Sequence, residues 1–255
     1  MTEIAAVVVT HGPSPDLDVC LSALEPQVDE LLVVANLAGE VPEVPAGVRL
    51  IVNARPVGFA ANVNHGMRST KAPLVVVANP DAAARFDAVE KLASFVESHP
   101  RCGVAGPQLL FPDGTWQPSA RRFPTVSGTL VRRTPLRLVF PPHKYNRSHY
   151  RLDERIPTEP VPADWMLAAF WMIRRSAFEE LGGMDEGFRL YGEDIDFCYR
   201  AHQAGWQRWY VPESVVVHRH AAVTDYKFFD RYTLWHLAGV LRFVRKHPET
   251  LRARR

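Results

Sequence analysis

Several features that mark particular protein classes are scarce in this chain of 255 residues. Its three cysteines, Cys20, Cys102 and Cys198, lie far apart without a CxxC pair, so neither a zinc site nor a disulfide framework is expected. Lys and Arg total 30 against 28 acidic residues, which gives no reason to expect nucleic acid as the partner. No stretch approaches the roughly 20 apolar residues that span a bilayer, and no basic segment precedes the first apolar run. These absences predict a cytoplasmic protein.

Short runs rich in valine, leucine and isoleucine alternate with stretches of helical spacing. Continuous apolar runs of this length suit parallel strands that are buried on both faces, joined by helical crossovers. The predicted strands are residues 4–10, 31–35, 48–52 and 74–78, and the predicted helices are residues 16–24, 59–69 and 87–99. The sequence therefore predicts an α/β fold with a mostly parallel sheet flanked by helices, and ligands bound at the carboxyl ends of the strands.

The second half of the chain has a different character. Residues 111–162 contain many prolines and little periodicity, which predicts a long loop region that partly covers the site. Regular structure is expected again from an apolar run at 164–173, a helix at 176–181, two strand-like runs at 209–211 and 215–217, and a long amphipathic helix at 226–246.

Two acidic segments far apart in the sequence indicate the chemistry. Asn79-Pro80-Asp81 follows the predicted strand 74–78, and the run from Gly192 to Asp196 opens a helix-like stretch. A carboxylate in a strand-end loop can hold a divalent cation against a diphosphate, and a second carboxylate can take a proton from an incoming hydroxyl. Together they suggest transfer from a nucleotide-linked donor. Taken alone, NPD is also a good turn sequence, and carboxylates favour the first turn of any helix.

Five segments in this order and spacing resemble the family 2 glycosyltransferases with a GT-A fold, over about residues 4–220. They are VVVT at 7–10, VVAN at 33–36, the segment beginning NARPVGF at 53–64, NPD at 79–81, and GGMDEGF through YGEDID at 182–196, closing with His218. Within the family, the pattern is most similar to bacterial rhamnosyltransferases that build cell-wall linkers and surface polysaccharides. The resemblance implies a GT-A domain over 1–223, with a nucleotide-binding part to about 110 and an acceptor-binding part after it, and a C-terminal helix and basic tail over 224–255.

The resemblance also implies a donor site. Its members would be Thr10, Asn36, Arg55, Gly58, Asn64, Asn79 and Asp81. Thr10 and Asn36 would read the base or ribose, while Gly58 would let the backbone approach the donor. Ala35 stands where the family usually has an acidic residue, so the identity of the nucleotide stays open.

A metal site of Asp81 and His218 is implied by the same resemblance. Carboxylate oxygen suits Mg²⁺ or Mn²⁺ bridging the two donor phosphates, and Asn79 would occupy the first position of a DxD-type motif. His218 would complete the site through an imidazole nitrogen, with His220 as a competitor. A structural histidine after a strand is the alternative.

Asp194 is the implied catalytic base of an inverting transfer, since one carboxylate must lie within reach of the acceptor hydroxyl. The adjacent Glu193 would cap the helix or hold the acceptor, and Asp196 would assist Glu193 or pair with Arg200.

The remaining acceptor candidates each have a plainer alternative. Trp165 would stack on a sugar or pack in the core. Arg121 and Arg122 would contact an acceptor phosphate or remain solvated loop charges.

The predicted C-terminal helix interleaves leucines and aromatic residues with Arg242, Arg245 and Lys246. This pattern is compatible with a helix that lies on an anionic membrane surface, at the inner face of the plasma membrane, and equally with a homodimer interface or packing on the catalytic domain.

These inferences predict an inverting, metal-dependent glycosyltransferase that moves a sugar, L-rhamnose from dTDP-rhamnose by resemblance, to a saccharide or polyprenyl-linked acceptor. A metal-dependent nucleotidyltransferase and a non-catalytic nucleotide-sugar-binding scaffold are the alternatives.

Overall fold

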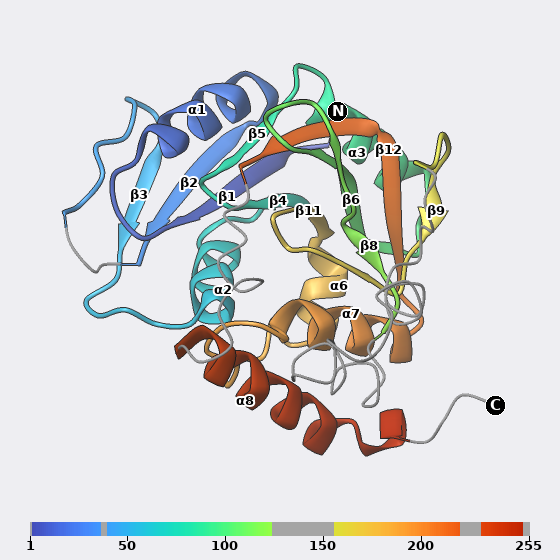
Figure 1. Ribbon diagram of the computed structural model, residues 1–255. Coiled ribbons are helices and arrows are strands. Elements are labelled where there is room, and N and C mark those ends of the chain that lie inside the picture. The colour runs from blue at the N-terminus through green and yellow to red at the C-terminus, as the bar shows by residue number, and fades with distance from the viewer. Residues whose placement is uncertain (1, 37–39, 124–155, 220–230, 252–255) are drawn as a thin grey trace.

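The computed structural model describes residues 2–36, 40–123, 156–219 and 231–251 (Figure 1). Its centre is a mixed sheet in which the strands lie in the order β3-β2-β1-β4-β11-β6-β12-β5, with β7 paired to β6 and β9 to β12. A separate two-stranded sheet is formed by β8 and β10. The expected α/β architecture with helices on both sides of a sheet is confirmed.

The strands are β1 (Ile4–Thr10), β2 (Glu30–Ala35), β3 (Arg49–Val52), β4 (Leu74–Ala78), β5 (Ala82–Ala84), β6 (Cys102–Leu110), β7 (Trp116–Gln117), β8 (Ala120–Arg121), β9 (Val161–Pro162), β10 (Trp165–Met166), β11 (Phe170–Arg174) and β12 (Gln207–His218). The helices are α1 (Pro15–Leu24), α2 (Phe59–Ser69), α3 (Ala88–Ser98), α6 (Arg175–Glu180), α7 (Glu193–Gln203) and α8 (Arg231–Lys246), with 3₁₀ turns at Glu25–Gln27 and Pro248–Leu251.

Strand direction decides where a ligand can bind. The strands β1, β2, β3 and β4 are mutually parallel, β11 is antiparallel to both β4 and β6, and β12 is parallel to β6. The reversal at β11 leaves β12 running in the same direction as β4. The carboxyl ends of β1, β2, β4 and β12 therefore meet at one edge of the sheet, where ligands of open α/β sheets bind.

Two apolar layers hold helices against the sheet. On one face, α1 and α3 pack over strand residues such as Ala6 and Val8. On the other, α2, α6 and α7 pack over residues such as Val7 and Val9, and α8 lies outside α7, where Phe243 meets Tyr199 edge to face (Figure 1). The alternation along β1 explains why its run is apolar throughout, since both faces of the strand are covered.

Most of the predicted elements are confirmed within a few residues, and α2 matches its predicted range. The two runs at 209–211 and 215–217 were expected as separate strands, but they belong to one long β12 with an irregular register between Val211 and Val215. In the proline-rich stretch, β7, β8 and β9 are present where a loop was expected. Residues 124–155 and 220–230 lie outside the described part, including His220 and the start of the predicted C-terminal helix.

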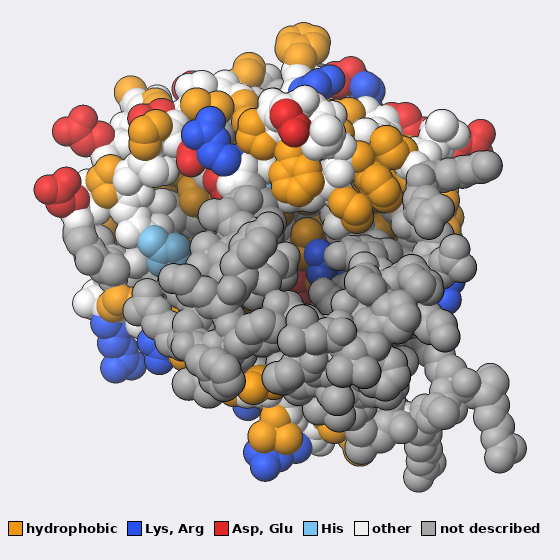
Figure 2. Space-filling model, viewed as in Figure 1, with side chains coloured by type: hydrophobic (Ala, Val, Ile, Leu, Met, Phe, Trp, Pro, Cys, Tyr) orange, Lys and Arg blue, Asp and Glu red, His pale blue; other side chains and the backbone are white. Residues whose placement is uncertain are grey.

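The described helices include none that is both long and apolar enough to cross a bilayer. On the face shown in Figure 2, acidic and basic side chains are interspersed with apolar ones over the described surface.

Candidate active site

The NPD segment forms a tight turn at the end of β4. The Ala82 N–H donates to the Asn79 carbonyl at 3.2 Å, and the Asn79 N–H donates to the Ala169 carbonyl at 2.9 Å. Pro80 occupies the second position of this turn, which its fixed φ favours. The turn leaves the Asp81 carboxylate partly exposed at the ligand-binding edge. NPD is thus a turn, and it also presents a carboxylate.

His218, the last residue of β12, brings an imidazole to the same place. Its Nε2 lies 3.4 Å from Oδ1 of Asp81, because β12 pairs with β5 and sets His218 opposite Ala82. Its Nδ1 lies 2.8 Å from Oε1 of Gln117, which turns Nε2 towards the Asp81 carboxylate. A carboxylate oxygen and a neutral imidazole nitrogen that face each other in this way would fit a cation between them.

The described residues contain no group of three or more His, Cys, Asp and Glu side chains arranged to hold a metal. A metal site built on Asp81 and His218 would therefore have few protein ligands among these residues. Mg²⁺ is commonly held by one or two carboxylates together with substrate phosphates, and the residues present fit a cation that shares its coordination with a diphosphate.

Gln117 is a site residue that the sequence interpretation missed. It lies on the two-residue strand β7, and its side chain is buried against His218. Nothing in the local sequence distinguishes it, because the pairing depends on β7 lying beside β6 and β6 beside β12.

Thr10 and Asn36 both lie at the predicted edge and are buried. Asn36 makes a reciprocal pair with the backbone of Val57: its Oδ1 accepts from the Val57 N–H at 2.7 Å, and its Nδ2 donates to the Val57 carbonyl at 2.9 Å. The Thr10 hydroxyl donates to the Gly12 carbonyl at 2.8 Å. These side chains shape the loops around the site, and Arg55 stands exposed in the loop that Asn36 holds.

Gly58 and Asn64 connect α2 to the acidic motif. A Cβ at Gly58 would lie 2.8 Å from the carbonyl oxygen of Phe188, so glycine permits close contact with that segment. Asn64 accepts from the Met184 N–H and donates to the Met184 carbonyl, both at 2.8 Å. Both residues were expected beside a donor, and in this structure their contacts are with residues 184–189.

The acidic motif opens α7, where Glu193 and Asp194 are neighbours at the first turn. Oε2 of Glu193 is buried and has no hydrogen-bond partner among the residues that the structure describes. Burial, followed by the charge of Asp194, raises the pKa of Glu193. Burial also raises the pKa of Asp194, while the hydrogen bond from the Ile195 N–H and the charge of Arg121 act in the opposite direction. A carboxylate with a raised pKa near neutrality suits a general base.

The acceptor candidates lie beside this pair. Arg121 and Trp165 are opposite each other in the β8–β10 sheet, and α7 packs on β10. The Arg121 guanidinium lies over the Trp165 ring, with Cζ 5.1 Å from the ring centroid. Trp165 is buried and donates from Nε1 to the Arg122 carbonyl at 2.8 Å, so its contacts are those of core packing, while Arg122 itself is exposed.

One short segment joins the two halves of the site. Gln117 contacts His218 at one end, and at the other end Arg121 pairs with Trp165 on β10, the strand on which α7 packs. Four residues of extended chain span at most about 14 Å. The structure therefore brings the Asp81–His218 pair and the Glu193–Asp194 pair to the two ends of one segment.

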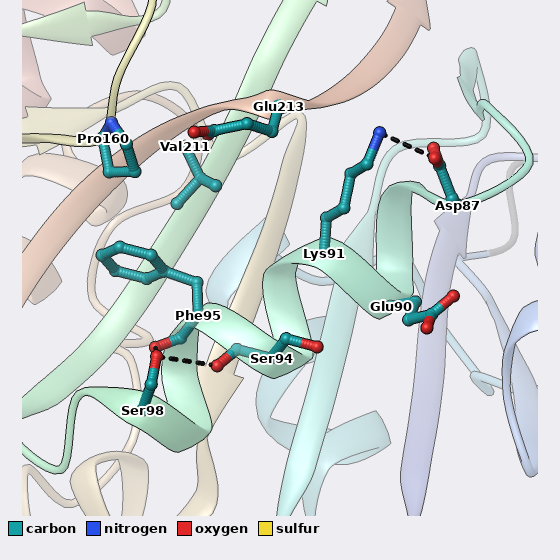
Figure 3. Close-up of a pocket in the computed structure, with 9 residues that line it drawn as sticks. All are labelled: Asp87, Glu90, Lys91, Ser94, Phe95, Ser98, Pro160, Val211 and Glu213. Atoms are coloured by element: carbon teal, nitrogen blue, oxygen red, sulfur yellow. Dashed lines mark hydrogen bonds and ion pairs between the residues drawn. The ribbon is translucent and has the colours of Figure 1, made fainter.

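A pocket of about 480 Å³ lies elsewhere, between α3 and β12 (Figure 3). Its lining includes the Asp87–Lys91 ion pair, Phe95 and Glu213. None of the predicted site residues lines it, so it is separate from the candidate active site.

Comparison with known sequences defines the class. The model of the "Glycosyltransferase like family 2" matches residues 3–233, and the chain belongs to that family. It is 32% identical over 248 residues to N-acetylglucosaminyl-diphospho-decaprenol L-rhamnosyltransferase of Mycobacterium tuberculosis, covering 88% of this chain and 78% of the relative. It is 34% identical over 94 residues to rhamnosyltransferase WbbL of Escherichia coli, covering 35% of each chain. The predicted family and its glycosyltransferase activity are confirmed.

Solved structures confirm the GT-A type of fold. The chain superposes with a TM-score of 0.69 on GalNAc-T7 crystallised with UDP, GalNAc and Mn²⁺, at 16% identity over 96% of this chain and 48% of the other. With the mannosyltransferase PcManGT of Pyrobaculum calidifontis in complex with GDP-Man and Mn²⁺, the TM-score is 0.61 at 14% identity, over 97% and 64% of the two chains.

Proposed function

We propose that this protein is an inverting, metal-dependent rhamnosyltransferase. It would move L-rhamnose from dTDP-rhamnose to a saccharide or polyprenyl-linked acceptor in cell-wall or surface polysaccharide synthesis. The rhamnosyltransferase relatives support the sugar, and the decaprenol-linked substrate in the name of the mycobacterial relative supports the acceptor class. Residues 1–110 would bind the donor and residues 111–223 the acceptor.

The observation that carries the metal-dependent proposal is the Asp81–His218 pair, in which a carboxylate and an imidazole nitrogen face each other at 3.4 Å. Mg²⁺ or Mn²⁺ held there would neutralise charge on the donor diphosphate as it leaves. The presence of Mn²⁺ in both GT-A neighbours is consistent with this assignment.

Asp194 would supply the base. The acceptor hydroxyl oxygen attacks the anomeric carbon, its proton passes to Asp194, and the bond from that carbon to the diphosphate oxygen breaks with release of a nucleoside diphosphate. Glu193, held protonated by burial, would donate a hydrogen bond to the acceptor. Arg121 and Arg122 supply positive charge on the acceptor side for a phosphate-bearing substrate.

The donor site would use the strand-end residues. Thr10, Asn36, Arg55 and Asn79 lie around one edge of the sheet, and Gly58 and Asn64 hold the loop that leads to the acidic motif. The nucleotide would bind over this edge.

The outer face of α8 would attach the protein to the anionic inner face of the plasma membrane. Leu237 and Leu241 are 44% and 50% exposed, and Arg245 follows one turn later. Apolar and basic side chains stand together at the lower edge of Figure 2, where α8 lies in Figure 1. An apolar stripe flanked by basic side chains is suited to an interfacial helix.

Calorimetry with dTDP-rhamnose, UDP-glucose, UDP-galactose and GDP-mannose, with and without Mn²⁺ or Mg²⁺, tests the donor. Metal-dependent binding of dTDP-rhamnose alone is expected, and preference for another donor would overturn the sugar assignment. Asp81→Ala should abolish the metal dependence, whereas the control Asp18→Ala, at an exposed position on α1, should not.

Product analysis then tests the chemistry. Release of nucleoside diphosphate is expected, while release of inorganic diphosphate would indicate a nucleotidyltransferase. Asp194→Asn should lower kcat by about a hundredfold or more while donor binding persists, since general bases typically contribute that much. Donor binding without any turnover by the unaltered protein would favour the scaffold alternative.

A further inference from the structure

Residues 181–192 form no helix or strand, yet they lead directly into α7 and its two carboxylates. The turn before α7 is unusual, because Tyr191 has a φ of 71° and Gly192 a φ of 101°. A non-glycine residue in the left-handed region persists only where surrounding contacts hold it. The position of Asp194 therefore depends on what holds this segment.

The first contact comes from the C-terminal helix. Arg242 of α8 donates from Nη2 to both carboxylate oxygens of Asp185, at 2.7 and 3.0 Å. Lys246, one turn later, donates to Oδ2 of Asp185 at 2.8 Å. Burial raises the pKa of Asp185, but the hydrogen bonds from Arg242 and Lys246 outweigh it and hold this pKa below its usual range.

The second contact joins α8 to α7 itself. Lys246 also lies 2.9 Å from Oδ1 of Asp196, and Nε2 of His247 lies 2.9 Å from the same oxygen. Asp196 is fully buried, and Arg200 of α7 donates to its Oδ2 at 2.8 Å. The Lys246 ammonium thus bridges the loop and the first turn of α7, two residues from Asp194.

The backbone of α8 lies directly on the turn. A Cβ at Gly239 would overlap the carbonyl oxygen of Tyr191, and a Cβ at Gly187 would overlap the guanidinium of Arg242. Two glycines therefore allow the helix and the loop to approach within contact distance.

From these contacts we propose that Arg242, Lys246 and His247 are positioning residues for sugar transfer, and that they act on Asp194 through Asp185 and Asp196. The proposal rests on the proposed function for its catalytic consequence. A misplacement of a reacting group by about 1 Å can cost on the order of a hundredfold in rate, so loosening this turn should lower kcat while leaving the donor edge intact.

Hydrogen exchange of the full chain provides a readout that does not depend on activity. Lys246→Met is expected to increase amide exchange in residues 185–196 and to leave exchange in β1 and β4 unchanged. Lys91→Met is the matched control, because Lys91 also pairs with an aspartate, Asp87 at 2.7 Å, but on the distant helix α3. Unchanged exchange in 185–196, or equal changes in both variants, would overturn the proposal.

Kinetics test the consequence for transfer. Lys246→Met should lower kcat about tenfold to a hundredfold. The dissociation constant of the donor should stay unchanged, and Lys246→Arg should restore most of the rate. A normal kcat together with increased exchange would show that the contacts are structural only. Absence of turnover by the unaltered protein would overturn the proposed function, while the exchange result would still decide whether α8 holds the segment.

A double-mutant cycle tests the proposal even if Lys246→Met folds poorly. The effects of Asp185→Asn and Arg242→Gln on exchange and kcat should be strongly non-additive, because each substitution disrupts the same ion pair between Asp185 and Arg242. Additive effects of the two changes would show that they act separately and would contradict the proposal.

Discussion

Gln117 accepts a hydrogen bond at Oε1 from Nδ1 of His218, over a distance of 2.8 Å. This bond orients the imidazole ring and directs Nε2 towards Asp81. Side chains that orient a metal-binding histidine in this way also increase its basicity. Gln117 is therefore part of the proposed metal site without contacting the cation.

We expect Gln117→Ala to weaken Mn²⁺ binding about tenfold to a hundredfold, as loss of such supporting partners commonly does. The measurement is calorimetric titration of Mn²⁺ into the protein saturated with a nucleoside diphosphate. Gln203→Ala, at an exposed position near the end of α7, is the control and should bind Mn²⁺ normally. Unaltered Mn²⁺ affinity in Gln117→Ala would mean that the glutamine serves packing alone.

Glu193 should make stability depend on pH in a defined direction. Because burial raises its pKa in the folded state, the folded protein retains a proton that the unfolded chain loses above about pH 4.3. The unaltered protein should lose stability as pH rises through this window, whereas glutamine does not ionise. We therefore expect the stability of Glu193→Gln relative to the unaltered protein to increase from pH 5 to pH 8.

Urea unfolding at several pH values measures this difference. Each unit of raised pKa corresponds to about 1.4 kcal/mol, which is large enough to be resolved by urea unfolding. Glu213→Gln makes the same change at an exposed glutamate of β12. If the difference for Glu193→Gln fell with rising pH, the carboxylate would be stabilised in its charged form and the assignment would be wrong.

Asn64 distinguishes a structural role from donor binding. Asn64→Ala removes both bonds to the Met184 backbone and leaves two buried polar groups unpaired. Each such group costs about 1–3 kcal/mol, so a loss of several kcal/mol in unfolding free energy is expected. His65→Ala, at the next and exposed position of α2, is the control. If Asn64→Ala instead kept full stability but bound the donor more weakly, Asn64 would be a donor-binding residue.

The positions of Asp81 and Asn36 at one edge of the sheet could be predicted because the signals for strand ends are local in the sequence. Asp81 follows a continuous apolar run, and the end of a buried parallel strand is a place where ligands bind. Asn36 was placed correctly at a strand end by the same reasoning. Its reciprocal bonds to Val57 could not be predicted, because they depend on how the loop after β3 folds back over β2.

The contacts of Asp196 in the acidic motif could be predicted only where they are local in sequence. A pairing of Asp196 with Arg200 four residues on was one of the two roles suggested for Asp196, and the structure contains it at 2.8 Å. The contacts of Asp196 with Lys246 and His247 cross about fifty positions in sequence and depend on how α8 packs. Packing on the catalytic domain was one of the three roles suggested for the predicted C-terminal helix, and Arg242 and Lys246 of α8 do bind carboxylates of that domain.

The outer face of α8 carries two exposed leucines that should contact the membrane. Leu237 and Leu241 lie one turn apart and are exposed, while Phe243 and the contacts of Arg242 face inwards. Leu237→Glu combined with Leu241→Glu should therefore disrupt membrane binding without loosening the inner contacts. Burial of two leucines contributes at least about 1.4 kcal/mol, or a tenfold change in partitioning.

Sedimentation with vesicles containing anionic phospholipid, at low salt, measures this partitioning. The unaltered protein should sediment with the vesicles and be partly released by added salt, because screening weakens the attraction of Arg245 to the headgroups. Val19→Glu introduces the same charge at an exposed apolar position of α1 and should bind normally. If the double variant sedimented like the unaltered protein, α8 would not be the membrane contact. If instead the unaltered protein did not bind and the double variant alone changed from dimer to monomer, the exposed leucines would belong to an interface between two copies of the chain.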